Sequence, residues 1–417
     1  MKLKDIVTFV SKSVVPQRGA KYNLYSLPSF DENKSAEVLD GAEIQSNKYD
    51  VPNKCILFNK LNVRFKRVWR INNSDSNKIA STEFLPLVVN EDVVDYQYCY
   101  YLLISDEITN YLCGQNSNTS GSHKRIDPQN FLNIDIHLPK MPIQKAIGKT
   151  LSNIDRKIEL NKRINDNLEA MAKQLYDYWF VQFDFPNEEG KPYKSSGGAM
   201  VWNENLKREI PQGWVVEKMG KCTNVLLGGT PDTNDNSLWG NGYNWLNSGE
   251  VAEFPILKSE KNITPKGLEK SATVLAPKGS VTLSITRHLR PSILCIDACI
   301  NQSVVAILEN DKISKEYIYP LLNRDIPRLM SLRTGAQQPH INKETVEAIN
   351  VVLPPANIMG AYINKAESIY NAIFNNAKEV EELTKQRDEL LPLLMNGQAS
   401  VNYHLSALFL SFFLYII

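Results

Sequence analysis

The sequence repeats one pattern of about fifty residues at a constant offset of 215. Residues 126–175 and 341–390 carry it without gaps. The matched positions are Ile126/Ile341, Ile134/Ile349, Leu138/Leu353, Pro139/Pro354, Ile154/Ile369, Ile158/Ile373, Asn161/Asn376, Leu168/Leu383 and Leu175/Leu390. Each copy runs from a loop through a strand and a proline into a long helix. A repeat of this size predicts two copies of one module in a chain of 417 residues, which is long enough for two globular domains.

The parts that precede the two long helices, residues 1–139 and 214–354, are each predicted to be a mixed α/β (α+β) domain. Short apolar runs such as Cys55–Phe58 and Phe84–Val89 alternate with turn signals. The turn that begins at Pro52 and the one that begins at Pro277 look like the same turn in two copies. Outside such turns and the shared end the domains differ almost completely, which indicates one scaffold with two different surfaces.

Two helices, 140–180 and 355–398, are expected to form a coiled-coil pair. Apolar positions step by four and three from Ile147 to Trp179, and again from Tyr362 to Leu394. Packing of each helix on its own domain is the alternative, but neither domain needs so long a strut. Asn161 and Asn376 fall in the seam, where an asparagine either fixes the register or marks a solvated position.

Two further segments are defined by composition. Residues 181–213 are rich in Gly, Pro, Ser and charge, which predicts a linker between the modules. Residues 399–417 form a tail whose apolar part, 405–417, is shorter than the roughly 20 residues that span a bilayer. We expect an extension with little function rather than a membrane anchor.

Charge and cysteine content exclude some classes of protein. The formal net charge is +1, so any basic surface for nucleic acid must be local. The six cysteines form no CxxC pair and no cluster with histidine, and the N-terminus lacks an apolar signal core. The expectation is a reduced, cytoplasmic protein without structural zinc.

Catalytic motifs are missing from the sequence. There is no phosphate-binding GxxxxGK[ST] loop, no GxGxxG turn, no HExxH and no GxSxG. Methyltransferases that act on amino groups carry an Asn-Pro-Pro-Tyr or Asp-Pro-Pro-Tyr turn, and this is missing too. A chain without catalytic, cofactor-binding or metal-binding residues is therefore expected.

Basic residues gather in one segment of the first domain and in two segments of the second, Thr286–Arg290 and Arg333–His340. The first, around Phe65 and Trp69, contains no acid; on a strand, alternation would divide its cations between two faces. In the second, Arg could pair with guanine and Gln with adenine in the major groove. Ordinary solvated loops are the alternative for both. The candidate DNA-binding residues are Arg64, Lys66, Arg67, Arg70, Arg287, His288, Arg290, Arg333, Gln337 and Gln338.

Taken together, several segments resemble the specificity subunit of Type I restriction-modification enzymes. The resemblance extends to about Leu405, although Thr119–Ile126 is a looser version of Thr334–Ile341. The segments that carry it are Ile154–Asn161, Tyr178–Val181, Pro211–Gly220, Gly228–Pro231, Thr334–Asn342, Val351–Pro355 and Gln386–Gly397.

The resemblance implies two target-recognition domains, each of which recognises half of a split site in double-stranded DNA, separated by antiparallel helices that act as a ruler. It also implies two modification subunits that bind S-adenosylmethionine and methylate adenine, and restriction subunits that use ATP and Mg to translocate and cut. Two alternatives are a recognition partner of a combined restriction-methylation polypeptide and a silent or recombination-donor specificity gene.

Overall fold

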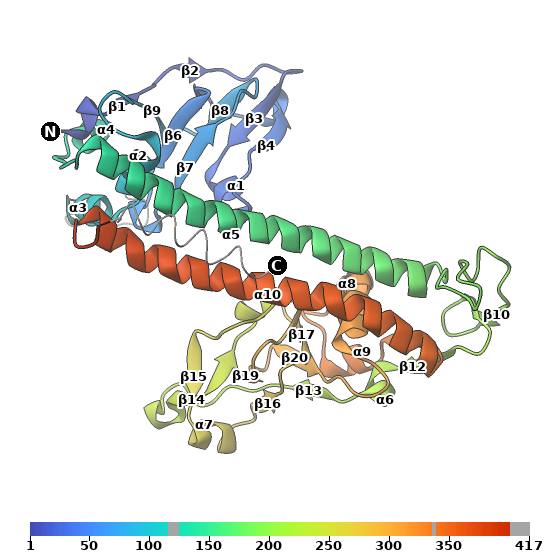
Figure 1. Ribbon diagram of the computed structural model, residues 1–417. Coiled ribbons are helices and arrows are strands. Elements are labelled where there is room, and N and C mark those ends of the chain that lie inside the picture. Colours follow the sequence, from blue (N-terminus) through green and yellow to red (C-terminus); the bar gives the residue numbers. More distant parts are fainter. Residues whose placement is uncertain (116–124, 336–338, 401–417) are drawn as a thin grey trace. The chain divides into compact units, whose positions relative to one another are not determined.

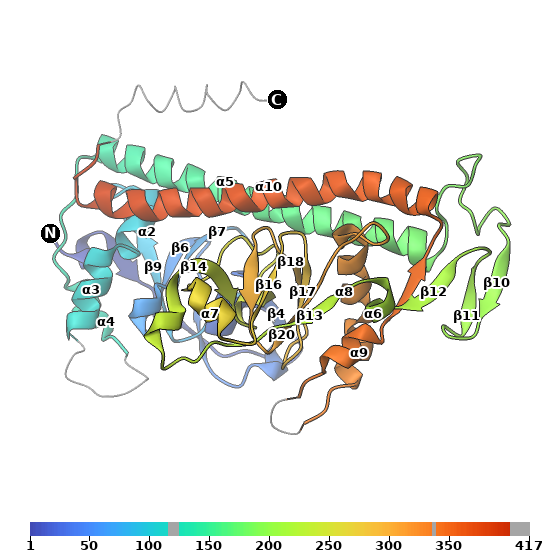
Figure 2. The same cartoon turned by 90° about the horizontal axis from the view of Figure 1, so that it is seen from below.

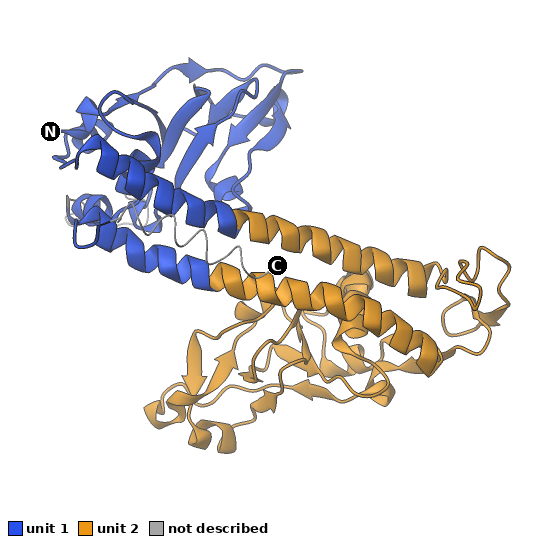
Figure 3. Cartoon of the chain, viewed as in Figure 1, with its two compact units in different colours: residues 1–158, 382–417 blue, residues 159–381 orange. Residues whose placement is uncertain are grey.

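The computed structural model describes residues 1–115, 125–335 and 339–400. The chain divides into two compact units, which are coloured separately in Figure 3. Unit 1 comprises residues 1–158 and 382–417, and unit 2 comprises residues 159–381. Each unit contains one of the predicted mixed domains together with part of both long helices. Unit 1 is therefore built from two distant stretches of sequence.

Two sheets form the body of unit 1 (Figure 1). The first is antiparallel, in the order β1-β9-β6-β7, and the second has the order β2-β5-β8-β3-β4, with β3 parallel to β8. The strands are β1 (Val7–Phe9), β2 (Ser13–Val14), β3 (Lys21–Tyr25), β4 (Glu37–Asp40), β5 (Lys48–Asp50), β6 (Lys54–Asn59), β7 (Val68–Asn72), β8 (Lys78–Ala80) and β9 (Phe84–Val89).

Unit 2 repeats this topology, except that its second sheet has four strands where that of unit 1 has five. One antiparallel sheet has the order β13-β20-β17-β18, and the other has the order β15-β14-β19-β16, with β14 parallel to β19. The strands are β13 (Val225–Leu227), β14 (Trp239–Leu246), β15 (Lys261–Ile263), β16 (Val274–Ala276), β17 (Val281–Ser284), β18 (Pro291–Ile293), β19 (Ala298–Ile300) and β20 (Val304–Ile307). The duplication seen in the sequence at the end of each module therefore extends through both sheets.

Short helices complete each unit at equivalent places. Asp127 caps α4 by accepting from the amides of Gln129 and Asn130, and Asn342 caps α9 by accepting from the amide of Thr345. In unit 2, α8 lies against β17 and β18 (Figure 2). The helices are α1 (Leu27–Glu32), α2 (Tyr96–Leu103), α3 (Asp106–Gln115), α4 (Pro128–Leu132), α6 (Met219–Cys222), α7 (Pro265–Glu269), α8 (Lys315–Ser331) and α9 (Lys343–Glu347). A further antiparallel pair of strands within unit 2, β12 (Val215–Lys218) and β21 (Asn350–Leu353), precedes and follows its two sheets in the sequence.

The two long helices are α5 (Met141–Tyr176) and α10 (Ala356–Met395), and both continue from one unit into the other. Within unit 1, Ile147 and Leu151 of α5 share a core with Leu394 of α10. Within unit 2, Ala172 and Tyr176 share a core with residues of α10 that include Tyr362, Ala366, Tyr370 and Ile373. The predicted seam positions Ile147, Leu151, Ile158, Tyr362, Ala366 and Ile373 are all buried. The helices pair within one chain, as predicted.

The predicted seam asparagine Asn161 is buried and makes a specific contact. Its side-chain amide donates to the Glu379 carboxylate at 2.7 Å. Next to it, Asn165 donates to the Ile373 carbonyl at 3.1 Å and accepts from Asn376 at 3.1 Å. These bonds connect opposite helices within unit 2, so the seam asparagines have partners on the facing helix, as residues that fix the register do.

The segment 181–213, for which the composition predicts a linker, contains a folded hairpin. Strands β10 (Met200–Asn203) and β11 (Arg208–Pro211) pair as a hairpin, and Phe183, Phe185 and Ile210 are buried with Trp214. Phe185 stacks on Tyr193 and on Trp214, and these aromatic contacts help to hold the segment together. The overall composition of the segment does not indicate such contacts. The apolar tail 405–417 lies outside the described residues. Within the described ranges, no helix is both long and apolar enough to cross a bilayer.

Candidate nucleic-acid interface

The candidate basic residues of both units lie on or beside the same hairpin loop of the repeated fold. In unit 1 the loop joins β6 to β7 (residues 60–67), and in unit 2 it joins β17 to β18 (residues 285–290). The same contact anchors both loops: the amide of Ile126 donates to the Lys60 carbonyl at 2.9 Å, and the amide of Ile341 donates to the Ile285 carbonyl at 3.0 Å. Two clusters that seemed unrelated in the sequence therefore occupy equivalent positions.

Both loops turn at an equivalent residue with left-handed backbone geometry. An isolated bridge pairs Leu61 with Arg125 in unit 1, and another pairs Thr286 with His340 in unit 2. The residue that follows each bridge has a positive φ, 52° at Asn62 and 55° at Arg287. Asparagine tolerates this conformation, whereas an arginine adopts it at a cost of about 1 kcal/mol or more. The contacts of the loop therefore hold Arg287 in a backbone conformation that is unfavourable for an isolated arginine.

The basic segment of unit 1 is not one strand, so the alternation of faces that a strand would impose does not apply to it. Residues Val63–Phe65 form a short 3-10 turn, Lys66 has a φ of 47°, and β7 begins only at Val68. The left-handed residues at both ends of the turn break the extended backbone that alternation requires. As a result, the side chains of this loop have different environments from one residue to the next.

Three cations of this loop differ in how far they are neutralised. Arg67 donates twice to the Asp31 carboxylate, at 2.6 and 2.7 Å, and Lys66 pairs with Asp106 at 2.5 Å. Arg64 is exposed, and within the described part of the chain it has no acidic partner. Of the three, Arg64 has the charge most available to an anion such as DNA phosphate.

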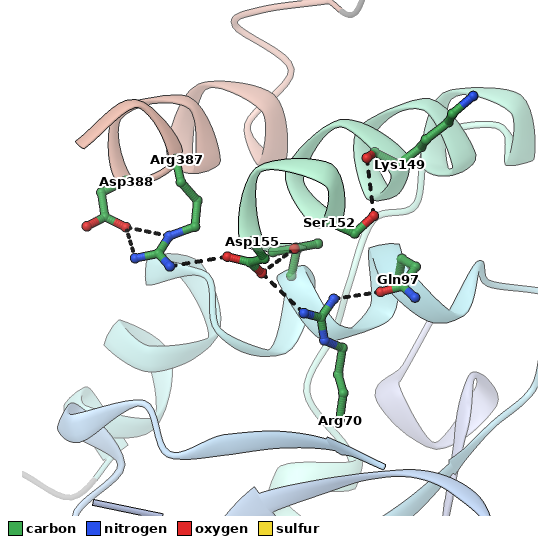
Figure 4. Close-up of polar contacts among 8 residues, drawn as sticks. Arg70, Gln97, Lys149, Ser152, Asp155, Arg387 and Asp388 are labelled. Atoms are coloured by element: carbon green, nitrogen blue, oxygen red, sulfur yellow. Dashed lines mark hydrogen bonds and ion pairs between the residues drawn. The ribbon is translucent and has the colours of Figure 1, made fainter. Parts of the chain in front are cut away.

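Arg70 is held in a network of polar side chains that joins a strand to helices (Figure 4). From β7 it donates to Gln97 of α2 at 2.6 Å and to Asp155 of α5 at 3.3 Å. Its guanidinium lies 4.2 Å from the centre of the Tyr100 ring. A phosphate contact by Arg70 stays a prediction, but these bonds assign it a role in holding β7 against the helices.

Asp155 is the centre of this network. Besides Arg70, its carboxylate accepts from the Tyr101 hydroxyl at 2.5 Å and from Arg387 of α10 at 3.2 Å. Burial, together with the neighbouring Asp155 charge, raises the pKa of Tyr101, so the hydroxyl keeps its proton and remains a donor. Partly buried Asp155 thus connects the sheet domain of unit 1 to both long helices.

In unit 2 the structure brings four candidate residues together. Arg287, His288 and Arg290 are exposed on the β17–β18 loop, and Arg333 reaches this loop from the end of α8. The Arg333 guanidinium donates to the Arg287 carbonyl at 2.6 Å and to the Met330 carbonyl at 3.1 Å. The other two candidates, Gln337 and Gln338, lie outside the described residues.

Sequence reasoning did not single out Phe65 as a candidate, although the side chain is 52% exposed on the unit 1 loop. The guanidiniums of Arg64 and Arg67 each lie 4.7 Å from the centre of its ring. The signal available was an aromatic residue flanked by cations; its exposure depends on the tertiary fold. Among the described residues no group of three or more His, Cys, Asp or Glu side chains could hold a metal ion.

Two copies of one mixed fold, each with a basic hairpin loop and a different surface, define a two-domain recognition protein without a recognisable catalytic centre among its described residues. Residues 1–170 and 211–387 match the model of the type I restriction modification DNA specificity domain. The chain belongs to this family, and it is a DNA specificity subunit of a type I restriction-modification system.

Curated relatives agree with this assignment, and a solved structure has a similar fold. The chain is 23% identical over 415 residues to the Type I restriction enzyme HindI specificity subunit of Haemophilus influenzae, covering 85% of this chain and 90% of the relative. It is 23% identical over 333 residues to the MjaIX specificity subunit of Methanocaldococcus jannaschii, covering 78% and 74%. The fold is similar to the crystal structure of the type I restriction-modification S subunit from M. genitalium, with a TM-score of 0.57, 13% identity and coverage of 94% and 95%. The two alternative functions considered above are not favoured.

Proposed function

We propose that each unit recognises one half of a split site in double-stranded DNA through its basic hairpin loop. The observation that carries the proposal is the equivalence of the β6–β7 and β17–β18 loops, which present different side chains from the same place in the fold. A repeated scaffold with different loops suits two different half-sites. Linking two weak contacts in one chain raises the effective concentration of the second and multiplies selectivity.

The proposed base and phosphate contacts are divided between the two loops. Arg64, Lys66 and Arg67 are assigned to the first half-site, with Arg64 the most available for phosphate. Arg287, His288 and Arg290 are assigned to the second half-site, and Gln337 and Gln338 remain candidates for adenine. Arg70 and Arg333 are assigned to positioning, because their guanidiniums are already bonded to other parts of their units.

Catalysis is assigned to partner subunits. Two modification subunits that bind S-adenosylmethionine are proposed to methylate adenine at the sites this chain selects, and restriction subunits to use ATP and Mg to translocate and cut, within the cytoplasm. A row of exposed apolar side chains on α5 and the turn after it supports assembly with another protein. Leu160, Ile164, Met171 and Tyr178 are 53, 38, 52 and 37% exposed, and the last three are spaced by seven residues.

The long helices are proposed to set the number of base pairs between the half-sites. Support comes from their continuity and from the asparagine contacts, which fix the register of α5 against α10 in unit 2. A spacer that is measured in this way needs no base contacts. The spacer is then selected by its length and not by its base sequence.

Exchange of one domain between related chains tests the proposal. Residues 1–139 are replaced by the same region of a relative with a different target, and the methylated motif is mapped in cells that supply the modification subunits. One half of the motif should change while the other half and the spacer stay the same. Replacement of residues 214–354 is the matched experiment and should change only the other half. A change of both halves after either exchange contradicts independent recognition.

A further inference from the structure

Phe65 is an exposed aromatic side chain on a loop that also carries several cations. The side chain is half exposed at the tip of the β6–β7 loop, although burying a phenylalanine ring in the core stabilises a protein by about 1.5–3 kcal/mol. The loop places it there firmly: left-handed residues Asn62 and Lys66 flank the turn, and Lys66 is tied to Asp106. An apolar ring held outward in this way is available to a ligand.

The surroundings of the ring indicate what kind of ligand. Arg64 and Arg67 lie over it, each 4.7 Å from the ring centre, and Arg67 is fixed by its double hydrogen bond to Asp31. Arg64, the cation of this pair that Asp31 does not neutralise, attracts the phosphate backbone of DNA. A phenyl ring gains nothing from a phosphate, whereas it gains from burying an apolar group of a base.

The position of the guanidiniums also limits how the ring can meet a base. An aromatic wedge between stacked base pairs needs its faces free, and inserting Phe65 in this way would remove the cations that lie over it. Contact through the exposed part of the ring with a group that projects into the major groove leaves those cations in place. The 5-methyl group of thymine is the apolar group that projects there.

We propose that Phe65 is a specificity-determining residue that contacts the 5-methyl group of a thymine in the half-site recognised by unit 1. The inference rests on the proposed function and adds a residue and a base to it. Arg64 beside it supplies charge without base preference, so the same loop combines a sequence-specific contact with a sequence-independent one.

The experiment uses the full chain in complex with its modification subunits and duplexes that contain the methylated motif. Each thymine of the first half-site is replaced in turn by deoxyuridine, which removes only the 5-methyl group. The wild-type complex should lose affinity about fourfold at one thymine, the effect expected for one buried methyl group. The complex with Phe65→Ala should bind the thymine duplex more weakly than the wild-type complex does. It should bind the thymine duplex and the deoxyuridine duplex with equal affinity. Phe65→Leu should retain part of the preference.

Arg64→Ala is the matched control in the same loop. It should weaken binding to every duplex, lower the salt slope by about one, and leave the thymine preference intact. The inference is overturned if no thymine in that half-site shows the methyl effect, or if Phe65→Ala keeps the effect while the protein remains folded by thermal melting. A wild-type complex without any preference for the motif contradicts the proposed function itself, which is a distinguishable result.

Discussion

The Asp155 carboxylate accepts a hydrogen bond from the Arg387 guanidinium at 3.2 Å, and this contact joins α5 to α10 within unit 1. The same carboxylate holds Arg70 of the sheet domain. Removing the Asp155 carboxylate leaves the partly buried guanidiniums of Arg70 and Arg387 without their shared partner. We expect Asp155→Ala to lower the free energy of unfolding of unit 1 by about 1–3 kcal/mol, measured by denaturant unfolding with hydrogen exchange to assign the unit.

Asp388→Ala is the control for this prediction. Asp388 also bonds to Arg387, but its side chain is 60% exposed, so its loss should change stability by less than about 1 kcal/mol. Equal effects of the two substitutions would show that Asp155 has no special position in the network.

Arg333 should influence the second half-site through Arg287. Arg333→Ala removes the hydrogen bond to the Arg287 carbonyl and frees a loop residue held at a φ of 55°. Affinity for the motif should fall roughly tenfold, as expected for a bond from a charged group, with discrimination lost only in the second half. Binding to duplexes altered in either half measures this. Arg328→Ala, which breaks a pair with Asp325 on the same helix, should leave both halves unchanged.

Salt dependence should separate the cations of the first loop. Arg64→Ala should lower the slope of log affinity against log salt by about one, because its charge is available to phosphate. Arg67→Ala should lower the slope less, since Asp31 already neutralises that guanidinium. Arg70→Ala should reduce stability instead. If all three slopes equal that of the wild type, the loop does not contact phosphate.

A charge in the exposed apolar row of α5 should prevent assembly. Met171→Glu places a carboxylate on a surface that is proposed to be covered by a modification subunit, where burying it is unfavourable. Size-exclusion chromatography of the chain mixed with modification subunits should show loss of the complex while the chain keeps its melting temperature. Lys162→Ala, an equal change of charge at an exposed position on the same helix, is the control. Normal assembly of the Met171→Glu chain removes this surface from the proposal.

Paired insertions into the helices should change the spacer. Asn161 lies opposite Glu379, so one heptad inserted after Asn161 and one after Lys378 keeps the helices in register while adding about 10 Å. The methylated motif should keep both half-sites and gain about three base pairs between them. An insertion after Asn161 alone should destabilise the subunit. An unchanged spacer after the paired insertion shows that another subunit sets the distance.

The repeat and the helix seam could be predicted from sequence because both depend on local periodicity. The buried positions Ile147, Leu151 and Ile373 follow directly from steps of three and four residues. The equivalence of the two loops could not be recognised in the sequence. The number of positions that separates Asn62 from Arg287 differs from the constant offset that relates the shared ends of the two modules. Loop lengths change such offsets, and only strand pairing restores the correspondence.

The individual basic residues could not be sorted from sequence. The role of Arg70 depends on Asp155, which lies 85 residues further along the chain. Asp155 in turn bonds to Arg387, which lies another 232 residues beyond it. The environment of Arg67 likewise depends on Asp31, on a different element. A cluster of like charges in a sequence gives no information about which acids the fold brings to it.

The discontinuity of unit 1 has a consequence for synthesis of the protein. Residues 1–158 leave the ribosome before any of unit 2, yet Ile147 and Leu151 share their core with Leu394. The first domain to be translated therefore completes its packing only when nearly the whole chain has been made. Until then, the apolar side of the first part of α5 lacks its partner helix and needs protection from other chains. A premature stop at residue 382 would leave unit 2 intact in sequence and unit 1 incomplete.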